Sequence, residues 1–157
     1  MLWSRSMRHA NGQLSFSATD LSRHLACNHL TSLRRGVAFG ELEPPPSYDD
    51  PRAEVLRQRG VEHEQRLLAQ LAADGRTVAT ITPPDTPFSH RDPIAVAART
   101  RGEMRRGTDV IYQGRLEDDD GRWSGYPDFL LRVDRPSALG GWSYEVLDAK
   151  LARRAKG

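Results

Sequence analysis

Two aspartates and a lysine in the C-terminal part of the sequence have residue types and spacing suited to metal-dependent hydrolysis. Asp128 lies in the run GYPDFLLRV, and Asp148 and Lys150 lie in YEVLDAKLAR. Paired carboxylates suit Mg²⁺ or Mn²⁺, and such an ion activates water and stabilises charge on a phosphate under attack. An ammonium group nearby orients or deprotonates that water. The three side chains could therefore hydrolyse a phosphate ester if the fold brings them together.

Both runs are expected to form strands. Residues 126–133 and 142–151 are rich in aromatic, β-branched and aliphatic side chains, and a turn-forming segment separates them. Side chains alternate along a strand, so Asp148 and Lys150 point the same way. If the two strands pair, Asp128 joins them on one polar patch above an apolar face. A solvated Asp–Lys pair on a polar strand face is the alternative, and spacing alone favours it.

The same two runs resemble a nuclease signature. Pro127-Asp128 followed by Asp148-Ala149-Lys150 resembles PD-(D/E)xK, and the longer runs resemble RecB-like nucleases, which include the CRISPR-associated RecB-type exonucleases. The resemblance implies a metal-dependent deoxyribonuclease with Asp128, Asp148 and Lys150 as catalytic residues. It further implies that both aspartates and the main-chain carbonyl of Ala149 bind Mg²⁺ or Mn²⁺, while Lys150 positions or activates the attacking water.

A long helix is predicted over residues 51–75, with Asp50 as its N-cap and proline at its first position. Leu67 and Leu71 recur at helical spacing with His63, which places the histidine on or beside the buried face. A lone histidine in such a place is ordinarily a hydrogen-bonded core residue.

His63 also belongs to the run GVEHE, which resembles the Gly-x-x-His element of RecB-like nucleases. The resemblance implies that His63 is a further metal ligand, and an imidazole among carboxylates favours Mn²⁺ over Mg²⁺. Glu62 and Glu64 are expected to be solvated.

The N-terminal segment predicts a helix over residues 17–36 with Cys27 near its middle. Ser17 and Asp20 have the spacing of a capping box. A small buried thiol that packs the helix is the simple interpretation of Cys27. The run LACNHL also resembles the helix that carries the first cluster cysteine of iron–sulfur RecB-like nucleases. Cys27 would then be an iron–sulfur ligand in a full-length form, and only if that form has C-terminal cysteines, because this sequence contains one cysteine.

The expected fold is α+β, a restriction-endonuclease-like core in which N-terminal helices precede a three-stranded antiparallel sheet. A short strand is predicted over 77–82, a helix over 93–107 and a strand over 109–116, and residues 116–123 are expected to turn into the strand that carries Asp128. Residues 1–157 are expected to be a single RecB-like nuclease domain whose C-terminal part is missing, because the resemblance implies a further Gln-x-x-x-Tyr helix. A truncated chain of this kind is expected to be inactive or weakly active.

Composition agrees with nucleic acid as a partner without requiring it. The 157 residues carry a formal net charge of +2 and have a pI near 9.0. No apolar run reaches membrane-spanning length, and the single cysteine excludes an internal disulfide, so a cytoplasmic protein without a membrane partner is expected. The resemblance implies DNA as the partner, with a helicase in the same pathway or polypeptide. The alternatives are a non-catalytic module that retains the fold and binds nucleic acid or a protein partner, and a remnant without function.

Overall fold

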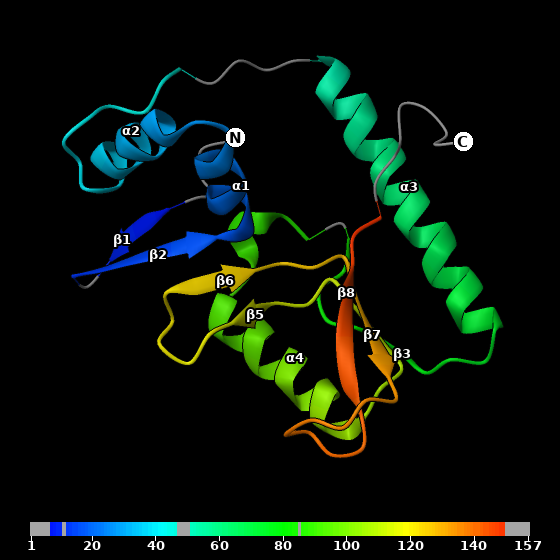
Figure 1. Cartoon of the computed structure of the whole chain (residues 1–157). Helices are drawn as coiled ribbons and strands as arrows, with labels where there is room; N and C mark the ends of the chain where they lie inside the picture. Colours follow the sequence, from blue (N-terminus) through cyan, green and yellow to red (C-terminus); the bar gives the residue numbers. More distant parts are fainter. Residues whose placement is uncertain (1–6, 11, 47–50, 85, 150–157) are drawn as a thin grey trace. The chain divides into compact units, whose positions relative to one another are not determined.

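The structure is a computed structural model that describes residues 7–10, 12–46, 51–84 and 86–149. It has the mixed α+β class that the sequence predicts (Figure 1). The described residues form two compact units. The first unit contains residues up to 46 together with Glu117–Gly125, and the second contains Pro51 to Leu116 and the residues from Tyr126 onwards.

The first unit combines two helices with a small mixed sheet. The strand order is β1-β2-β6-β5, in which β1 and β2 are antiparallel and β2 and β6 are parallel. These strands are β1 (Arg8–Ala10), β2 (Gln13–Ser17), β5 (Leu116–Glu117) and β6 (Trp123–Gly125). The sequence did not predict the two N-terminal strands. The rings of Phe16 and Trp123 stack across the β2–β6 pair, with centroids 5.1 Å apart.

The N-terminal helical segment is broken at Cys27, so the prediction of one helix over 17–36 is wrong. Helix α1 (Ala18–Ala26) and helix α2 (Asn28–Ala38) are separated by this residue, whose backbone is extended at φ −163° and ψ 108°. Cys27 is exposed, which rules out the buried packing role. The predicted cap of α1 is confirmed, because Asp20 Oδ2 accepts hydrogen bonds from Ser17 N at 2.8 Å and from Ser17 Oγ at 2.7 Å.

The second unit is built on a four-stranded sheet of order β3-β4-β7-β8. Strands β4, β7 and β8 are antiparallel neighbours, whereas β3 pairs with β4 in parallel. The sheet is therefore mixed, and not the purely antiparallel three-stranded sheet expected. Its strands are β3 (Val78–Thr80), β4 (Val110–Tyr112), β7 (Phe129–Val133) and β8 (Ser143–Leu147).

A helix packs on each face of this sheet. Leu67, Leu68 and Leu71 of α3 (Pro51–Ala73) pack with one set of strand residues, which comprises Val78, Val110, Tyr112, Phe129 and Leu131. Val96 and Met104 of α4 (Pro93–Arg106) pack on the other face, against Ile81, Ile111, Leu130 and Tyr144. The alternation of apolar side chains along β4 and β7 explains this arrangement, because neighbouring residues serve opposite faces.

The ends of α4 follow the predicted signals. Asp92 Oδ1 accepts hydrogen bonds from the main-chain N–H groups of Ile94 at 3.0 Å and Ala95 at 3.3 Å. Gly107 ends the helix in the left-handed conformation at φ 75°. None of the helices in the described part of the chain is both long enough and apolar enough to cross a membrane.

The strand predicted over 109–116 is shorter than expected. β4 ends at Tyr112, because Gln113 has a left-handed backbone at φ 53°. The turn that follows joins β5 to β6, and β6 pairs with β2 in the other sheet. It therefore does not lead directly into the strand after Asp128, as the sequence had suggested.

Candidate active site

The two predicted motifs meet at one end of the β7–β8 pair. The last residue pair of this ladder is Phe129 opposite Leu147, so Asp128 comes directly before β7 and Asp148 directly after β8. Asp128 Oδ2 accepts a hydrogen bond of 2.9 Å from the main-chain N–H of Ala149. Asp128 is half-buried and Asp148 is exposed. Lys150 lies outside the described residues.

Ala149 lies on the apolar side that the alternation of the two strands predicted. It packs against the core cluster that contains Phe129, and Leu131 packs against the same cluster. This placement confirms that residues 129, 131 and 149 share one side, and it fixes the peptide after Asp148 against the sheet.

Tyr112 brings α3 into the same region. Its side chain is fully buried, it lies opposite Phe129 in the sheet, and its hydroxyl donates a hydrogen bond of 2.8 Å to Glu64 Oε2. Burial raises the pKa of Tyr112, and the hydrogen bond to Glu64 and the charges of Glu64 and Asp128 raise it further. Glu64 and Asp128, from distant parts of the chain, therefore both raise the pKa of the Tyr112 hydroxyl.

Glu64 is a site residue that the sequence interpretation missed. It was expected to be solvated, but it is half-buried and accepts hydrogen bonds from Tyr112 and from Gln113 Nε2, the latter at 2.9 Å. Residues four apart share a helix face, and Glu64 is four residues before Leu68 as His63 is four before Leu67. Since both leucines pack on the sheet, the buried face includes both positions, and the 64–68 spacing was the signal that could have revealed it.

His63 is half-buried on α3, next to Glu64 in the sequence, and Glu62 is exposed as expected. Within the residues that the structure describes, no three His, Cys, Asp or Glu side chains are placed to hold one metal ion. His63, Asp128 and Asp148 are therefore not gathered into a ligand set. The donor types nevertheless fit Mg²⁺ or Mn²⁺, because carboxylate oxygens and a main-chain carbonyl lie at the same end of β7 and β8.

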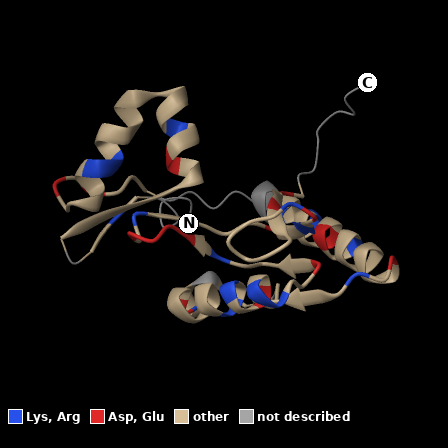
Figure 2. Ribbon diagram, turned by 60° about the horizontal axis from the view of Figure 1, so that its bottom comes forward, with Lys and Arg blue, Asp and Glu red and all other residues tan. Residues whose placement is uncertain are grey.

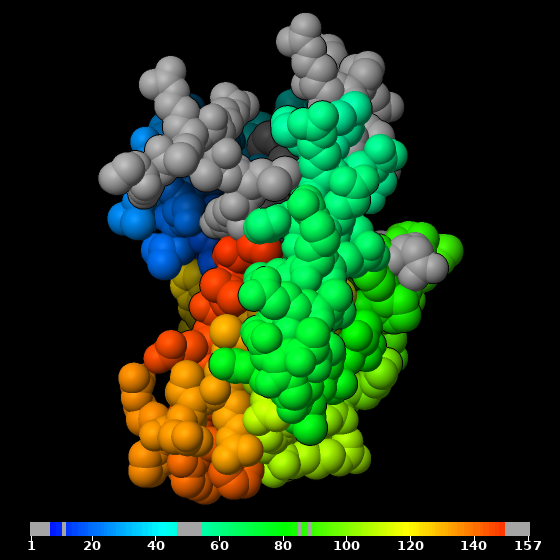
Figure 3. Space-filling model, turned by 90° about the vertical axis from the view of Figure 1, so that its right-hand side faces the viewer, coloured from blue at the N-terminus to red at the C-terminus, as the bar shows by residue number. Residues whose placement is uncertain are grey.

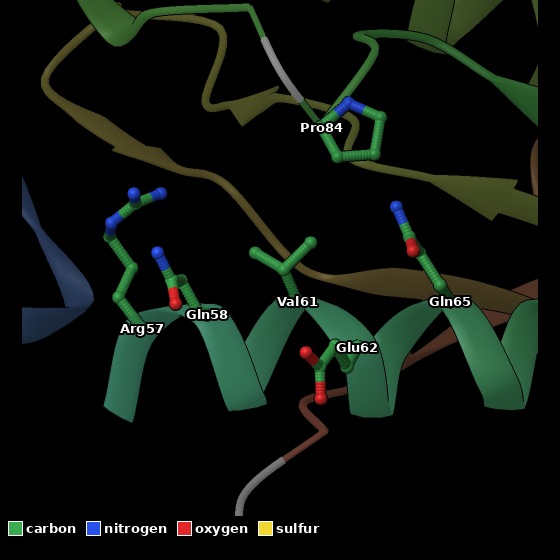
Figure 4. A pocket seen from close by; sticks show the side chains of 6 residues that line it. All are labelled: Arg57, Gln58, Val61, Glu62, Gln65 and Pro84. Carbon is green, nitrogen blue, oxygen red and sulfur yellow. The ribbon is translucent and has the colours of Figure 1, made fainter. Parts of the chain in front are cut away.

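An open groove lies along the middle of α3 in the second unit. Figure 4 shows Val61 and Gln65 on the side of the helix that faces Pro84. The groove is lined by Arg57, Gln58, Val61, Glu62, Gln65 and Pro84. In Figure 3 the red-orange residues of the C-terminal segment, which include β8, lie beside the green helix α3. Neither Asp128 nor Asp148 lines this groove.

Helix α4 carries several arginines, whose positions are blue on the ribbon in Figure 2. Four of them are exposed, Arg99, Arg101, Arg105 and Arg106. Arg106 pairs with Glu103, and Arg99 Nη2 donates a hydrogen bond of 3.5 Å to the carbonyl of Thr80. The helix thus offers a basic face with few acidic neighbours on the helix itself, since Glu103 is its one acidic residue.

Comparison of the chain with protein-family models, with curated proteins and with solved structures gave no match.

Proposed function

We propose that this chain is a metal-dependent nuclease of the PD-(D/E)xK type that hydrolyses DNA phosphodiesters, built on a restriction-endonuclease-like core. The observation that carries the proposal is the hydrogen bond from the Ala149 N–H to the Asp128 carboxylate. A PD-(D/E)xK site needs the acid of its first motif beside the peptide of its second, so that both serve one ion. This hydrogen bond supports the proposal, because it brings the carboxylate of the first motif next to the peptide of the second.

In the proposed site, Asp128, Asp148 and the main-chain carbonyl of Ala149 would hold Mg²⁺ or Mn²⁺, and His63 would add an imidazole from α3. When bound, such an ion would supply Lewis-acid stabilisation of the phosphate and would lower the pKa of a water molecule. Lys150 positions or deprotonates the attacking water, and its ammonium stabilises negative charge that develops on the phosphate. The exposed arginines of α4 provide phosphate contacts that do not depend on sequence.

Two variants separate metal binding from chemistry. Asp148→Asn should weaken Mn²⁺ binding to the 157-residue chain, measured by isothermal titration calorimetry. Lys150→Ala should bind Mn²⁺ like the wild type but lose cleavage of linear and circular DNA, because the amine acts on water and is not a ligand. A chain that takes up no Mn²⁺ at millimolar concentrations and leaves DNA intact would end the nuclease proposal.

The basic face of α4 favours a second candidate, a module that binds nucleic acid without cutting it. Such a module binds DNA with an affinity that falls steeply as salt rises, because basic side chains displace counterions from phosphates. DNA binding that is equal with Mn²⁺ and with a chelator, together with intact DNA after long incubation, would favour this candidate.

A further inference from the structure

Gln113 has an unusual backbone for its residue type. Its φ of 53° makes it the only residue other than glycine with a positive φ in the described part of the chain. A left-handed conformation of this kind costs an ordinary residue about 1–3 kcal/mol, and it persists only where surrounding contacts hold it. Gln113 directly follows β4. The contacts that hold it should therefore be informative.

Three contacts connect Gln113 to different segments of the second unit. Its main-chain N–H donates a hydrogen bond of 2.9 Å to the carbonyl of Asp128. Its side-chain Nε2 donates to Glu64 Oε2 at 2.9 Å, and its Oε1 accepts from Arg91 Nη1 at 3.4 Å. Arg91 is held in turn by the carbonyl of Thr86, which accepts from Nε at 3.3 Å and from Nη2 at 3.2 Å.

We propose that Gln113 is a positioning residue of the candidate metal site. Its main chain fixes the backbone of Asp128, and its amide fixes Glu64 and with it the turn of α3 that carries His63. The main chain and the side chain of one residue thus set where a helix donor and a sheet donor lie relative to each other. Glycine would adopt this φ without strain but has no side-chain amide to donate to Glu64. This inference rests on the proposed function, because it assumes that Asp128 and His63 serve a metal ion.

Gln113→Asn tests the proposal with a small change. Asparagine tolerates the left-handed conformation better than most residues, so the backbone bond to Asp128 should persist. Its amide is one methylene shorter and cannot reach Glu64 and Arg91 together. We expect the Kd for Mn²⁺, measured by calorimetry, to rise about 10- to 100-fold, the usual effect of losing a group that orients metal ligands. The melting temperature should fall only modestly, because relief of backbone strain partly offsets the lost hydrogen bond to Glu64.

The matched control is Gln70→Asn, which makes the same chemical change on the exposed surface of α3 and should leave the Kd unchanged. If Gln113→Asn does not fold, Gln113→Gly replaces it, because glycine relieves the strain while removing the amide. Weak Mn²⁺ binding by a folded variant supports the proposal. Binding equal to the wild type overturns it and leaves the proposed nuclease function standing. A wild-type chain without Mn²⁺ binding overturns both.

Discussion

The carboxylate of Asp128 accepts a hydrogen bond from the main-chain N–H of Ala149 at 2.9 Å, although 21 positions separate the two residues. The antiparallel register of β7 and β8 produces this contact, because its final pair, Phe129 and Leu147, leaves one aspartate beyond each strand. The peptide that follows Asp148 thereby orients the carboxylate of Asp128. The geometry of the sheet, and not a flexible loop, sets the position of this acid.

Asp128→Asn should remove Mn²⁺ binding without unfolding the protein. The side-chain oxygen of asparagine still accepts the Ala149 N–H, so the free energy of unfolding in urea should change by less than about 1 kcal/mol. The neutral amide is a weaker ligand for a divalent cation, so calorimetry should detect no high-affinity Mn²⁺ site. Asp134→Asn, at a position whose side chain is 93% exposed, is the control and should bind Mn²⁺ normally. Normal binding by Asp128→Asn would contradict the assignment of this ligand.

Tyr112→Phe should destabilise the protein at neutral pH. The substitution removes a donor to the Glu64 carboxylate, and a hydrogen bond to a charged group contributes about 1.5–3 kcal/mol. Tyr144→Phe is the comparison, because the Tyr144 hydroxyl donates to the neutral carbonyl of Thr108 at 2.7 Å. Loss of this hydrogen bond should lower the free energy of unfolding by less, about 1 kcal/mol. Urea unfolding of both variants measures the difference. An equal loss in the two variants would mean that the Glu64 contact has no special strength.

Alkaline pH should distinguish Tyr112 in a second way. Burial and Glu64 raise the pKa of Tyr112 in the folded state, so the folded protein keeps a proton that the unfolded chain releases. This contribution to stability is complete below the ordinary tyrosine pKa, about 10, and is lost as pH rises through the folded-state pKa. The wild type should therefore begin to lose stability above about pH 10 and lose more as pH rises further, and Tyr112→Phe should lose less. If the free energy of unfolding falls with pH equally in the two proteins, the Tyr112 hydroxyl does not contribute to the loss of stability at alkaline pH.

Helix ends and strand alternation could be predicted because local chemistry determines them. Asp92 caps the N-terminus of α4 with its carboxylate, and Gly107 ends the helix in the left-handed conformation. The alternation around Phe129 and Leu131 predicted that these residues share an apolar side, which packs on α3, although the opposite side of β7 at Leu130 is buried as well. These features depend on a few neighbouring residues, so their pattern is visible in the sequence.

The features that could not be predicted depend on contacts between distant segments. Glu64 is half-buried where it accepts hydrogen bonds from Tyr112 and Gln113, which come after β3 and α4 in the sequence. The helical spacing through His63 did not include Glu64, so its burial was not predicted. Gln113 carries no residue-type signal for a left-handed backbone. The break at Cys27 was also invisible, because the leucine spacing continues across it although the backbone becomes extended.

The stability of the protein at acid pH should test the hydrogen bonds by which Asp109, just before β4, holds Thr77, just before β3. Asp109 Oδ2 accepts from the Thr77 hydroxyl at 2.7 Å and from the Thr77 main-chain N–H at 2.9 Å, and these bonds lower the pKa of Asp109. Its contribution to stability is present above the ordinary carboxyl pKa, about 4, and is lost as pH falls through the lowered value. Asp109→Asn should lessen the loss of stability between about pH 5 and about pH 2, measured by urea unfolding. An unchanged acid profile would contradict the role of this carboxylate.

Asp20→Ala should strongly destabilise the first unit. Asp20 and Arg34 are buried, with side-chain exposures of 4% and 5%, and Asp20 Oδ1 lies 3.7 Å from Arg34 Nη1. Removal of the carboxylate leaves a buried guanidinium without that partner, a change that typically costs about 3–5 kcal/mol, and it also removes the cap bonds to Ser17. The double variant Asp20→Ala/Arg34→Met should recover at least about 1 kcal/mol, because no charge remains buried. Urea unfolding followed by far-ultraviolet circular dichroism measures both variants, and a double variant no more stable than Asp20→Ala would show that the buried charge is not the cause.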